Sequence, residues 1–480
     1  MPTGSALLLR RARRIGHDEP VDLLLRDGRI ASLSGGTAAE EVDLDGRIVM
    51  PGLWDQHVHL TQWALARRRL DVSSATSAAH AVALVRARVA AGSPRLLVGY
   101  GFRDGLWPDV PTVAALDAAA GDVPVVLVSG DLHCAWASSA GLRYLGAPPV
   151  DGLLREGAWL PLQGAVDRMP DDESDELVAD ATRHAAALGV VGVVDFEIAD
   201  NLAVWRRRAA SAPPAVRVRA GVWADYLDRV LHADLHTGDR VAGLVEQGPL
   251  KAIVDGSLNT RTAWCDQAYP GSSSHGVLSV PSARLEPLLA HAHSHGLRVA
   301  VHAIGDAANR LALDAFAGTG ARGSVEHAQL VAPADLPRFA GLGVTASVQP
   351  RHAVDDRHVA DRHWPGRDAF AYAALHRAGA RLALGSDAPV APLDPWAAID
   401  AAVWRTDPGE SPWHPEQRLD VLTALAASVD GRPLGLRVGD PADLVVLDDD
   451  PVALAAVPGA LRGIRVAGTV VAGVWAAPLP

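Results

Sequence analysis

The pair His57 and His59 is the first group in this sequence whose types and spacing could do chemistry. The two histidines lie near the end of an apolar run that begins at Leu53. Residues two apart on a β-strand point to the same face, so both imidazoles could reach one metal ion. A lone His-x-His pair also arises by chance, so the pair alone is a weak indication of a metal site.

Further polar residues lie on or at the end of other apolar runs, namely Lys251, His302, His327 and Asp387. Neutral imidazoles and a carboxylate are ligands that suit zinc or a similar divalent ion. Each residue alone would more often be an ordinary core, rim or salt-bridging residue. The joint pattern is hard to obtain by accident, and it predicts a metal centre.

The runs that carry these residues alternate with helix-like segments. Eight runs are predicted to be strands, namely 53–59, 190–196, 216–222, 250–255, 297–302, 323–327, 344–349 and 381–387. Several are nearly continuous apolar runs, as expected for parallel strands that are buried on both faces. Eight strand-then-helix units predict an α/β fold, a (β/α)8 TIM-like barrel, whose active site lies at the carboxyl ends of the strands. The candidate ligands would therefore meet at one rim.

Both ends of the chain are instead rich in short strands. The dipeptides Asp27-Gly28 and Asp45-Gly46 are turn signals, and Gly468 and Gly473 are turn signals near the C-terminal end of the sequence. The predicted strands are 21–25, 29–33, 47–50, 443–447, 464–466 and 469–474. Chain termini often lie close in space. We therefore expect residues 1–50 and 436–480 to form one small composite β-sandwich beside a barrel of residues 51–435.

The first two predicted barrel strands are separated by a stretch far longer than one crossover helix needs. Segments 95–101 and 123–129 within it look like additional strands. We expect an inserted subdomain at about 66–185 that covers the barrel mouth.

Composition excludes several classes of protein. The net charge of −12 comes with no extended basic run, so no nucleic-acid partner is expected. The two cysteines, Cys134 and Cys265, are too few for a disulfide framework and suit a reducing cytoplasm. We find neither a signal-peptide core nor an uncharged apolar run of membrane-spanning length, so no membrane partner is expected. A small-molecule substrate is expected, and homo-oligomer formation is left open.

Several motifs resemble the amidohydrolase superfamily, and more narrowly its type-3 branch, which includes N-substituted formamide deformylase. The matching segments are 51–59 (PGLWDQHVH), Lys251 with 255–258 (DGSL), 301–306 (VHAIGD), 325–329 (VEHAQ), 349–352 (QPRH), 385–389 (GSDAP) and 439–447 (GDPADLVVL). The first and last barrel motifs are typical of the whole superfamily. The DGSL and VHAIGD segments point to the branch, although Asn259-Thr260 stands where the branch usually has Gly-Ser.

The resemblance implies a role for each candidate ligand. His57 and His59 would bind one metal ion with Asp387, and His302 and His327 would bind a second ion. Lys251, if carboxylated by carbon dioxide, would bridge the two ions; as a plain amine it would leave a site for one. The cofactor would be one or two divalent ions, zinc first. Such an ion lowers the pKa of water and polarises a carbonyl, and Asp387 would then carry the proton from that water to the leaving nitrogen.

Four further residues are weaker candidates. The resemblance suggests that His133, within the insertion, reaches the substrate as a catalytic residue. Arg261 and His352 fall in loops that follow strands and could bind a polar or anionic substrate group, and Trp107 could line an apolar pocket. Each could equally be an ordinary structural residue.

The sequence thus predicts a metal-dependent hydrolase that cleaves a non-peptide carbon–nitrogen bond, such as an amide or an N-formyl or N-acyl group. The same site could act on a cyclic amide, a carbamate, an aminated ring or an ester. A protein of another class, a scaffold that keeps the fold without the chemistry, is the remaining alternative.

Overall fold

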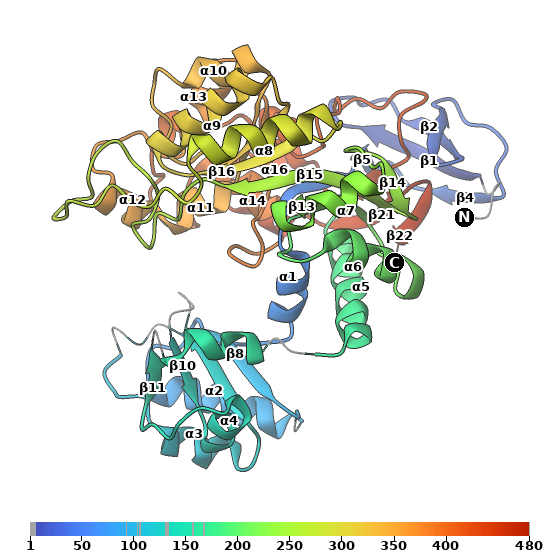
Figure 1. The fold of residues 1–480 in the computed structure, drawn as a ribbon. Helices are drawn as coiled ribbons and strands as arrows, with labels where there is room; N and C mark the ends of the chain where they lie inside the picture. Colours follow the sequence, from blue (N-terminus) through green and yellow to red (C-terminus); the bar gives the residue numbers. More distant parts are fainter. Residues whose placement is uncertain are drawn as a thin grey trace. The chain divides into compact units, whose positions relative to one another are not determined.

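The structure is a computed structural model. It describes residues 6–479 except 93, 103, 105–106, 130–133, 156–157 and 167–168. The chain divides into two compact units, one of Met1–Gln62 with Val178–Pro480 and the other of Trp63–Leu177. Each unit has its own sheets and its own hydrophobic core (Figure 1).

Eight parallel strands of the larger unit form a nearly closed barrel. They are β6 (Leu53–Val58), β12 (Val190–Asp195), β13 (Arg217–Trp223), β15 (Val245–Ile253), β16 (Val299–Ala303), β17 (Gly323–His327), β18 (Thr345–Val348) and β19 (Leu382–Leu384). The ring closes next to the candidate residues His57 and His59, where Val58 bridges to Ala388 and the His59 N–H donates to the Ala388 carbonyl at 2.8 Å. A short strand, β14 (Arg240–Ala242), pairs antiparallel with β15. The predicted (β/α)8 barrel is confirmed.

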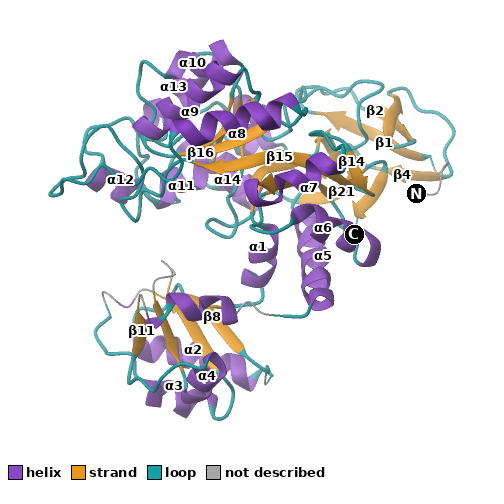
Figure 2. Cartoon of the chain, viewed as in Figure 1, coloured by secondary structure: helices purple, strands orange, loops and turns teal. Residues whose placement is uncertain are grey.

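Helices cover the outside of these strands (Figure 2). They are α5 (Asp171–Ala187), α6 (Asn201–Ser211), α7 (Leu227–His232), α8 (Ser282–Ser294), α9 (Asp306–Thr319), α10 (Leu336–Leu342), α11 (Pro350–Asp355), α12 (Arg357–His363), α13 (Tyr372–Arg377), α14 (Pro395–Trp404), α15 (Val421–Ala427) and α16 (Pro451–Leu454). Their sequence pattern explains how they pack. In α9 the buried residues Ala308, Ala312 and Phe316 recur every four positions, and the helix ends at Gly320 in the left-handed conformation.

Strands from the two ends of the chain share a second sheet of the same unit. From the N-terminal side come β1 (Leu7–Arg14), β2 (Val21–Arg26), β3 (Arg29–Ser32), β4 (Glu40–Asp43) and β5 (Ile48–Pro51). From the C-terminal side come β20 (Leu444–Leu447), β21 (Val466–Val471) and β22 (Val474–Ala477). β5 pairs antiparallel with β20, and Figure 1 shows the blue and red strands side by side. Both ends contribute to one apolar core that includes Leu23, Val49 and Val446.

The C-terminal strands differ from the prediction at one glycine. A turn was expected at Gly468, between strands 464–466 and 469–474, but β21 runs straight through this residue. The turn signal at Gly473 is confirmed, because Ala472 and Gly473 both have positive φ and lie between β21 and β22. Gly468 serves close packing, because a Cβ atom there would lie 2.8 Å from the ring of Trp475.

The smaller unit holds a five-stranded sheet in the order β11-β10-β9-β8-β7. The strands are β7 (Leu70–Asp71), β8 (Leu97–Phe102), β9 (Val125–Ser129), β10 (Cys134–Ala137) and β11 (Leu153–Arg155), with helices α2 (Ala78–Ala90), α3 (Val113–Ala120) and α4 (Ser139–Leu145). Helices α1 (Leu60–Ala66) and α5 cross the boundary between the units. The expected insertion, 66–185, overlaps this unit and extends through most of α5. That the insertion covers the barrel mouth remains a prediction.

No helix in the described part of the chain is both long enough and apolar enough to cross a membrane.

Candidate metal centre

The first cluster of candidate ligands gathers around Asp387, just beyond the end of β19. The Nε2 atoms of His57 and His59 each lie 3.5 Å from Asp387 Oδ1. Lys251 Nζ, from β15, lies 3.4 Å from His57 Nε2. These three strand ends are far apart in sequence, and barrel closure brings them to one point.

A second cluster shares Asp387 with the first. The ligand atoms of His327, His352 and Asp387 lie within 4.8 Å of one another, and the His352 ring stacks on that of His327. His302 is adjacent, with its ring centroid 4.5 Å from that of His327. Its Nε2 lies 3.2 Å from the Gly256 carbonyl oxygen. The structure thus adds His352, expected only as a substrate-binding residue, to the ligand cluster.

These residues fit a divalent cation. The set offers several imidazoles and one carboxylate, which are preferred zinc ligands. One buried nitrogen atom that faces the cluster, His352 Nε2, lies 3.9 Å from Asp387 Oδ2 and has no hydrogen-bond partner among the described residues. A buried polar atom without a partner is costly, so its presence here suggests a partner of another kind.

Burial keeps most of the imidazoles in the neutral form that a metal ion requires. Burial and the charge of Lys251 lower the pKa of His302 to about 4 and hold that of His57 well below its usual value. Burial and His302 do the same for His327. His59 is the exception, since burial lowers its pKa but the hydrogen bond and charge of Asp387 raise it more.

Lys251 is the only lysine of the chain, and all the remaining residues among its 44 Lys and Arg are arginines. Its side chain is buried at 2% exposure, with Nζ 4.6 Å from the centre of the Phe196 ring. Burial lowers the pKa of Lys251 to about 8, although Glu326 and Asp387 pull it upward. A substantial neutral fraction is therefore present near pH 8, and only the neutral amine can combine with carbon dioxide.

Two residues that the sequence analysis did not single out orient the histidines. Glu326 Oε2 lies 2.7 Å from His57 Nδ1, and Gln349 Oε1 lies 2.8 Å from His327 Nδ1. A hydrogen bond to one ring nitrogen fixes the tautomer and directs the other nitrogen toward the metal. Glu326 could have been noticed as an acidic residue within a buried strand, since such a charge needs a partner.

The backbone at two ligands is unusual. His327, Ala328 and Asp387 all have positive φ without being glycine. Such conformations cost about 1–3 kcal/mol each and tend to occur at functional sites. The positive φ of His327 ends β17 and turns the backbone away from the strand direction directly after Glu326.

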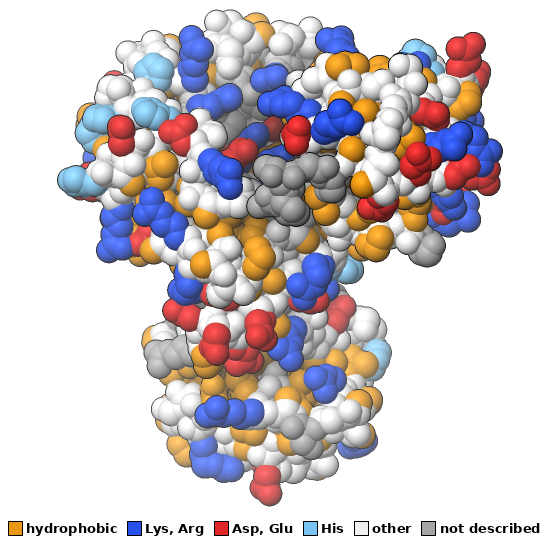
Figure 3. Space-filling view, turned by 90° about the vertical axis from the view of Figure 1, so that its right-hand side faces the viewer, with side chains coloured by type: hydrophobic (Ala, Val, Ile, Leu, Met, Phe, Trp, Pro, Cys, Tyr) orange, Lys and Arg blue, Asp and Glu red, His pale blue; other side chains and the backbone are white. Residues whose placement is uncertain are grey.

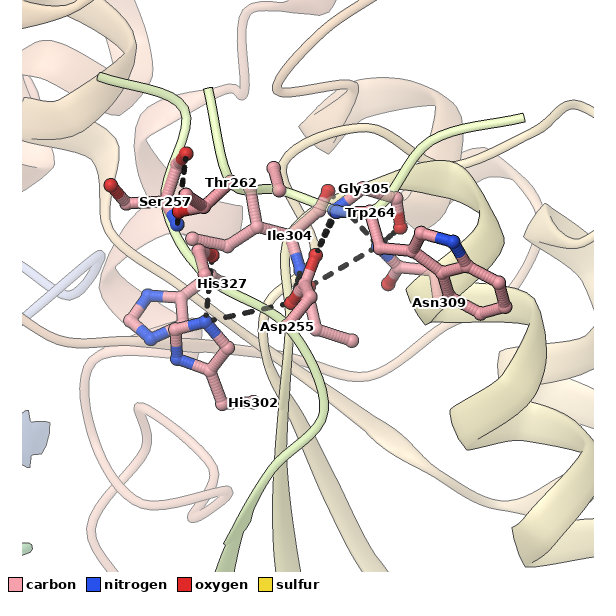
Figure 4. A network of polar contacts seen from close by, with 12 residues as sticks. Asp255, Ser257, Thr262, Trp264, His302, Ile304, Gly305, Asn309 and His327 are labelled. Carbon is pink, nitrogen blue, oxygen red and sulfur yellow. Dashed lines mark hydrogen bonds and ion pairs between the residues drawn. The ribbon is translucent and has the colours of Figure 1, made fainter. Parts of the chain in front are cut away.

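Asp255 ties together the loops that follow β15 and β16 (Figure 4). Its Oδ1 accepts the N–H of Ile304 at 3.0 Å, and its Oδ2 accepts those of Gly305 and Trp264, both at 2.8 Å. The same carboxylate lies 3.6 Å from His302 Nε2. Asp255 therefore fixes the loops around a candidate ligand, a role that its DGSL motif alone did not reveal.

The remaining candidates lie outside the cluster or outside the description. Arg261 is exposed on the loop after β15. Among the residues that the structure describes, no hydrogen bond or ion pair joins its side chain to the cluster. Trp107 belongs to the smaller unit, where its Nε1 donates to the Ala75 carbonyl at 3.0 Å and its ring packs against Phe102. His133 lies outside the described residues.

Comparison with known proteins identifies the family of this chain. The model of a family described as the amidohydrolase family matches residues 40–477. Protein LONG AFTER FAR-RED 3 of Arabidopsis thaliana is 30% identical, over 88% of this chain and 82% of that protein. N-substituted formamide deformylase of Arthrobacter pascens is 26% identical, over 94% of each chain. The crystal structure of an uncharacterized metal-dependent hydrolase from Pyrococcus horikoshii OT3 superposes with a TM-score of 0.80 at 27% identity, covering 96% of this chain and 99% of that one.

Proposed function

Because this chain belongs to the amidohydrolase family, we propose that it is a hydrolase that cleaves a non-peptide carbon–nitrogen bond of a small molecule. The bond would belong to an amide or to an N-formyl or N-acyl group. The observation that carries the proposal is the convergence of the candidate histidines and Lys251 on Asp387. Similarity to N-substituted formamide deformylase supports this choice of bond.

A zinc or similar ion would be held by His57, His59 and Asp387. A second ion would be held by His302 and His327, with His352 beside them and Lys251 as the bridge once it is carboxylated. When bound, the ions would supply polarisation of the scissile carbonyl and a lowered pKa for water.

Asp387 is the proposed general base. Burial raises the pKa of this carboxyl, but His57 and the hydrogen bond from His59 lower it more, so that it stays ionised. The carboxylate takes a proton from the attacking water. It then gives the proton to the nitrogen that leaves when the carbon–nitrogen bond breaks.

Two alternatives remain to be separated from this proposal. A cyclic amide, a carbamate, an aminated ring or an ester would undergo the same attack by water at a polarised carbon. A scaffold without activity is the second alternative, and the name of the Arabidopsis relative refers to no reaction. We also propose a cytoplasmic location, in keeping with a chain that has only two cysteines, too few for a disulfide framework.

A hydrolysis screen tests the proposal. The metal-replete protein is offered N-formyl, N-acyl, cyclic amide, carbamate, aminated-ring and ester substrates, with and without a chelator. We expect hydrolysis of an N-formyl or N-acyl compound, its loss with chelator and its return with zinc. Asp387→Asn should lower kcat/KM by roughly 10²–10⁴-fold, as for loss of a general base. Asp18→Asn removes an exposed carboxylate between β1 and β2, in the sheet formed by the chain ends, and should change nothing.

Cleavage of only a cyclic amide, a carbamate, an aminated ring or an ester would assign the function to that class of substrate instead. The absence of hydrolysis with every class would favour the scaffold. Activity that survives both the chelator and Asp387→Asn would contradict the role of this site.

A further inference from the structure

A pocket opens at the end of the barrel opposite the candidate metal centre, where the strands begin. It has a volume of about 290 Å³, and its lining includes Arg298 and Arg381, which directly precede β16 and β19, and Arg219 near the start of β13. Figure 3 faces this end of the barrel and shows basic side chains gathered around a hollow. The metal ligands lie at the other ends of the same strands.

The three arginines outnumber the carboxylates available to them. Arg219 holds both oxygens of Asp430, with two contacts of 2.7 Å, and Gln56 Nε2 also donates to Asp430 at 3.1 Å. Arg381 places its guanidinium against Gly431, where an added Cβ would lie 2.4 Å from Nη2. Within the described part of the chain, no carboxylate lies at ion-pair distance from Arg298 or Arg381.

The other acidic group of the pocket is already engaged. Glu326 lines its inner end, where one carboxylate oxygen contacts His57 Nδ1 and the other accepts the Ser324 hydroxyl. Arg217, which also lies at this end of the barrel, does have a partner in Asp443 at 2.8 Å. Arg298 and Arg381 differ from it in lining the pocket without such a carboxylate.

Such an excess has an electrostatic cost. Burial, followed by the charges of Arg219 and Arg381, lowers the pKa of Arg298 below its usual value. Like charges held around one hollow repel one another, and a bound anion would replace this repulsion with attraction.

We propose that this pocket binds a small tetrahedral oxyanion of the phosphate type between Arg298 and Arg381. Guanidinium groups bind such anions through paired, charge-assisted hydrogen bonds. Asp430 holds Arg219 in place as a third positive group, and hydroxyl side chains such as those of Thr237 and Thr345 line the same space. The volume exceeds that of a bare phosphate, so a phosphorylated small molecule also fits.

Calorimetric titration of the metal-replete full chain with inorganic phosphate tests this inference, with chloride at the same ionic strength as the reference. A second titration uses a sugar phosphate, to distinguish free phosphate from a phosphorylated molecule as the natural occupant. The variants are Arg298→Gln, Arg381→Gln and the double variant. Arg284→Gln is the matched control, because Arg284 is exposed on α8 and lies outside the pocket.

We expect saturable binding by the wild type and by the control, weakened about tenfold or more by each pocket variant, as for loss of a charge-assisted hydrogen bond. In phosphate-free buffer the double variant should unfold at a higher temperature than the wild type, because the repulsion is gone, and phosphate should no longer stabilise it. Undiminished phosphate binding by the double variant would place the anion elsewhere, such as at the metal centre, and would overturn the proposal. So would the absence of binding to the wild type.

Discussion

The contact between His57 Nδ1 and Glu326 Oε2 determines how the His57 ring is oriented at the candidate metal centre. With Nδ1 of His57 facing a carboxylate at 2.7 Å, Nε2 is left to face Asp387 and Lys251. His57 is itself 1% exposed, so water cannot substitute for this partner easily. The ring orientation is thus set by a residue that need not touch the metal or the substrate.

Replacement of Glu326 should therefore weaken metal binding without removing a ligand. We expect Glu326→Ala to lower zinc affinity by about 10–100-fold, the usual cost of losing such an orienting partner. Glu326→Gln keeps an acceptor oxygen and should lose less. Competition with a chromophoric chelator measures the affinity. Glu246→Ala removes a carboxylate that pairs with Arg219 in the same barrel and is the control. Equal affinities for Glu326→Ala and the wild type would refute the orienting role.

Lys251 gives a prediction with a definite sign in pH. Its pKa of about 8 means that the reactive neutral amine falls to roughly one tenth at pH 7 and rises to roughly nine tenths at pH 9. In metal-free protein at constant dissolved carbon dioxide, the rate of carbamate formation should rise about tenfold between these pH values. Carbon-13 NMR with labelled carbon dioxide follows the reaction.

Assignment of that signal is simple, because the side chain of Lys251 is the only lysine amine in the chain. Lys251→Ala should retain only the signal of the N-terminal amine. A wild-type signal no larger than that of the variant would show that Lys251 stays an amine and that the centre holds one ion.

At the scale of elements, Asp255 joins the loop that follows β15 to the loop that follows β16. Its loss would leave three backbone N–H groups without an acceptor, two of them buried and that of Trp264 part-buried, and each buried one costs roughly 1–3 kcal/mol. We expect Asp255→Ala to lower the free energy of unfolding by about 3 kcal/mol or more. Urea denaturation measures the change. Asp266→Ala, which breaks an exposed ion pair with Arg310, should cost less than about 1 kcal/mol. Similar values for the two variants would show that Asp255 is not a structural clamp.

The eight barrel strands were predictable because buried parallel strands are apolar along their whole length. Their exact ends were not. Residues 381–387 were expected to be one strand, but β19 stops at Leu384. Gly385 lies so close to β6 that a Cβ atom there would be 2.8 Å from the backbone nitrogen of His57. The chain then turns at Asp387, which has a positive φ. Such a close approach depends on closure of the barrel, which no local pattern encodes.

The positions of the candidate ligands at strand ends followed from the sequence pattern, and their binding of a metal ion stays a prediction, whereas their supporting partners did not follow from that pattern. His302 lies opposite Glu326 in the pairing of β16 with β17, and this register brings Glu326 into the barrel interior near His57. His352 enters the cluster from the first turn of α11 rather than from a strand. Contacts of this kind follow from register and helix placement, which the sequence alone did not define.

At the scale of the whole molecule, the division into two units gives a test of where the metal acts. All the candidate ligands that the structure describes belong to the larger unit, and the smaller unit has a separate core around Phe102 and Trp136. A ligand that binds only the native state stabilises what it binds, by about 4 kcal/mol at a thousand times its Kd.

Removal of the metal should therefore speed amide hydrogen exchange in β15, β16 and β17 and leave β8 and β9 unchanged. Exchange detected by mass spectrometry, with and without chelator, resolves these segments. Return of zinc should restore protection in the barrel strands. Equal loss of protection in β9 would show that the metal stabilises both units together.

The sheet built from both chain ends also bears on how the protein is made. Met50 pairs with Val445 and Pro51 with Leu444, so β5 leaves the ribosome long before its partner β20 exists. At about 5–20 residues per second, translation of the roughly 400 intervening residues takes about 20–80 s. During that time an edge of β5 that later becomes fully paired stays open to strands of other chains. Protection of β5 by a chaperone should therefore raise the yield of folded protein, and slower translation should lower it because β5 stays unpaired for longer.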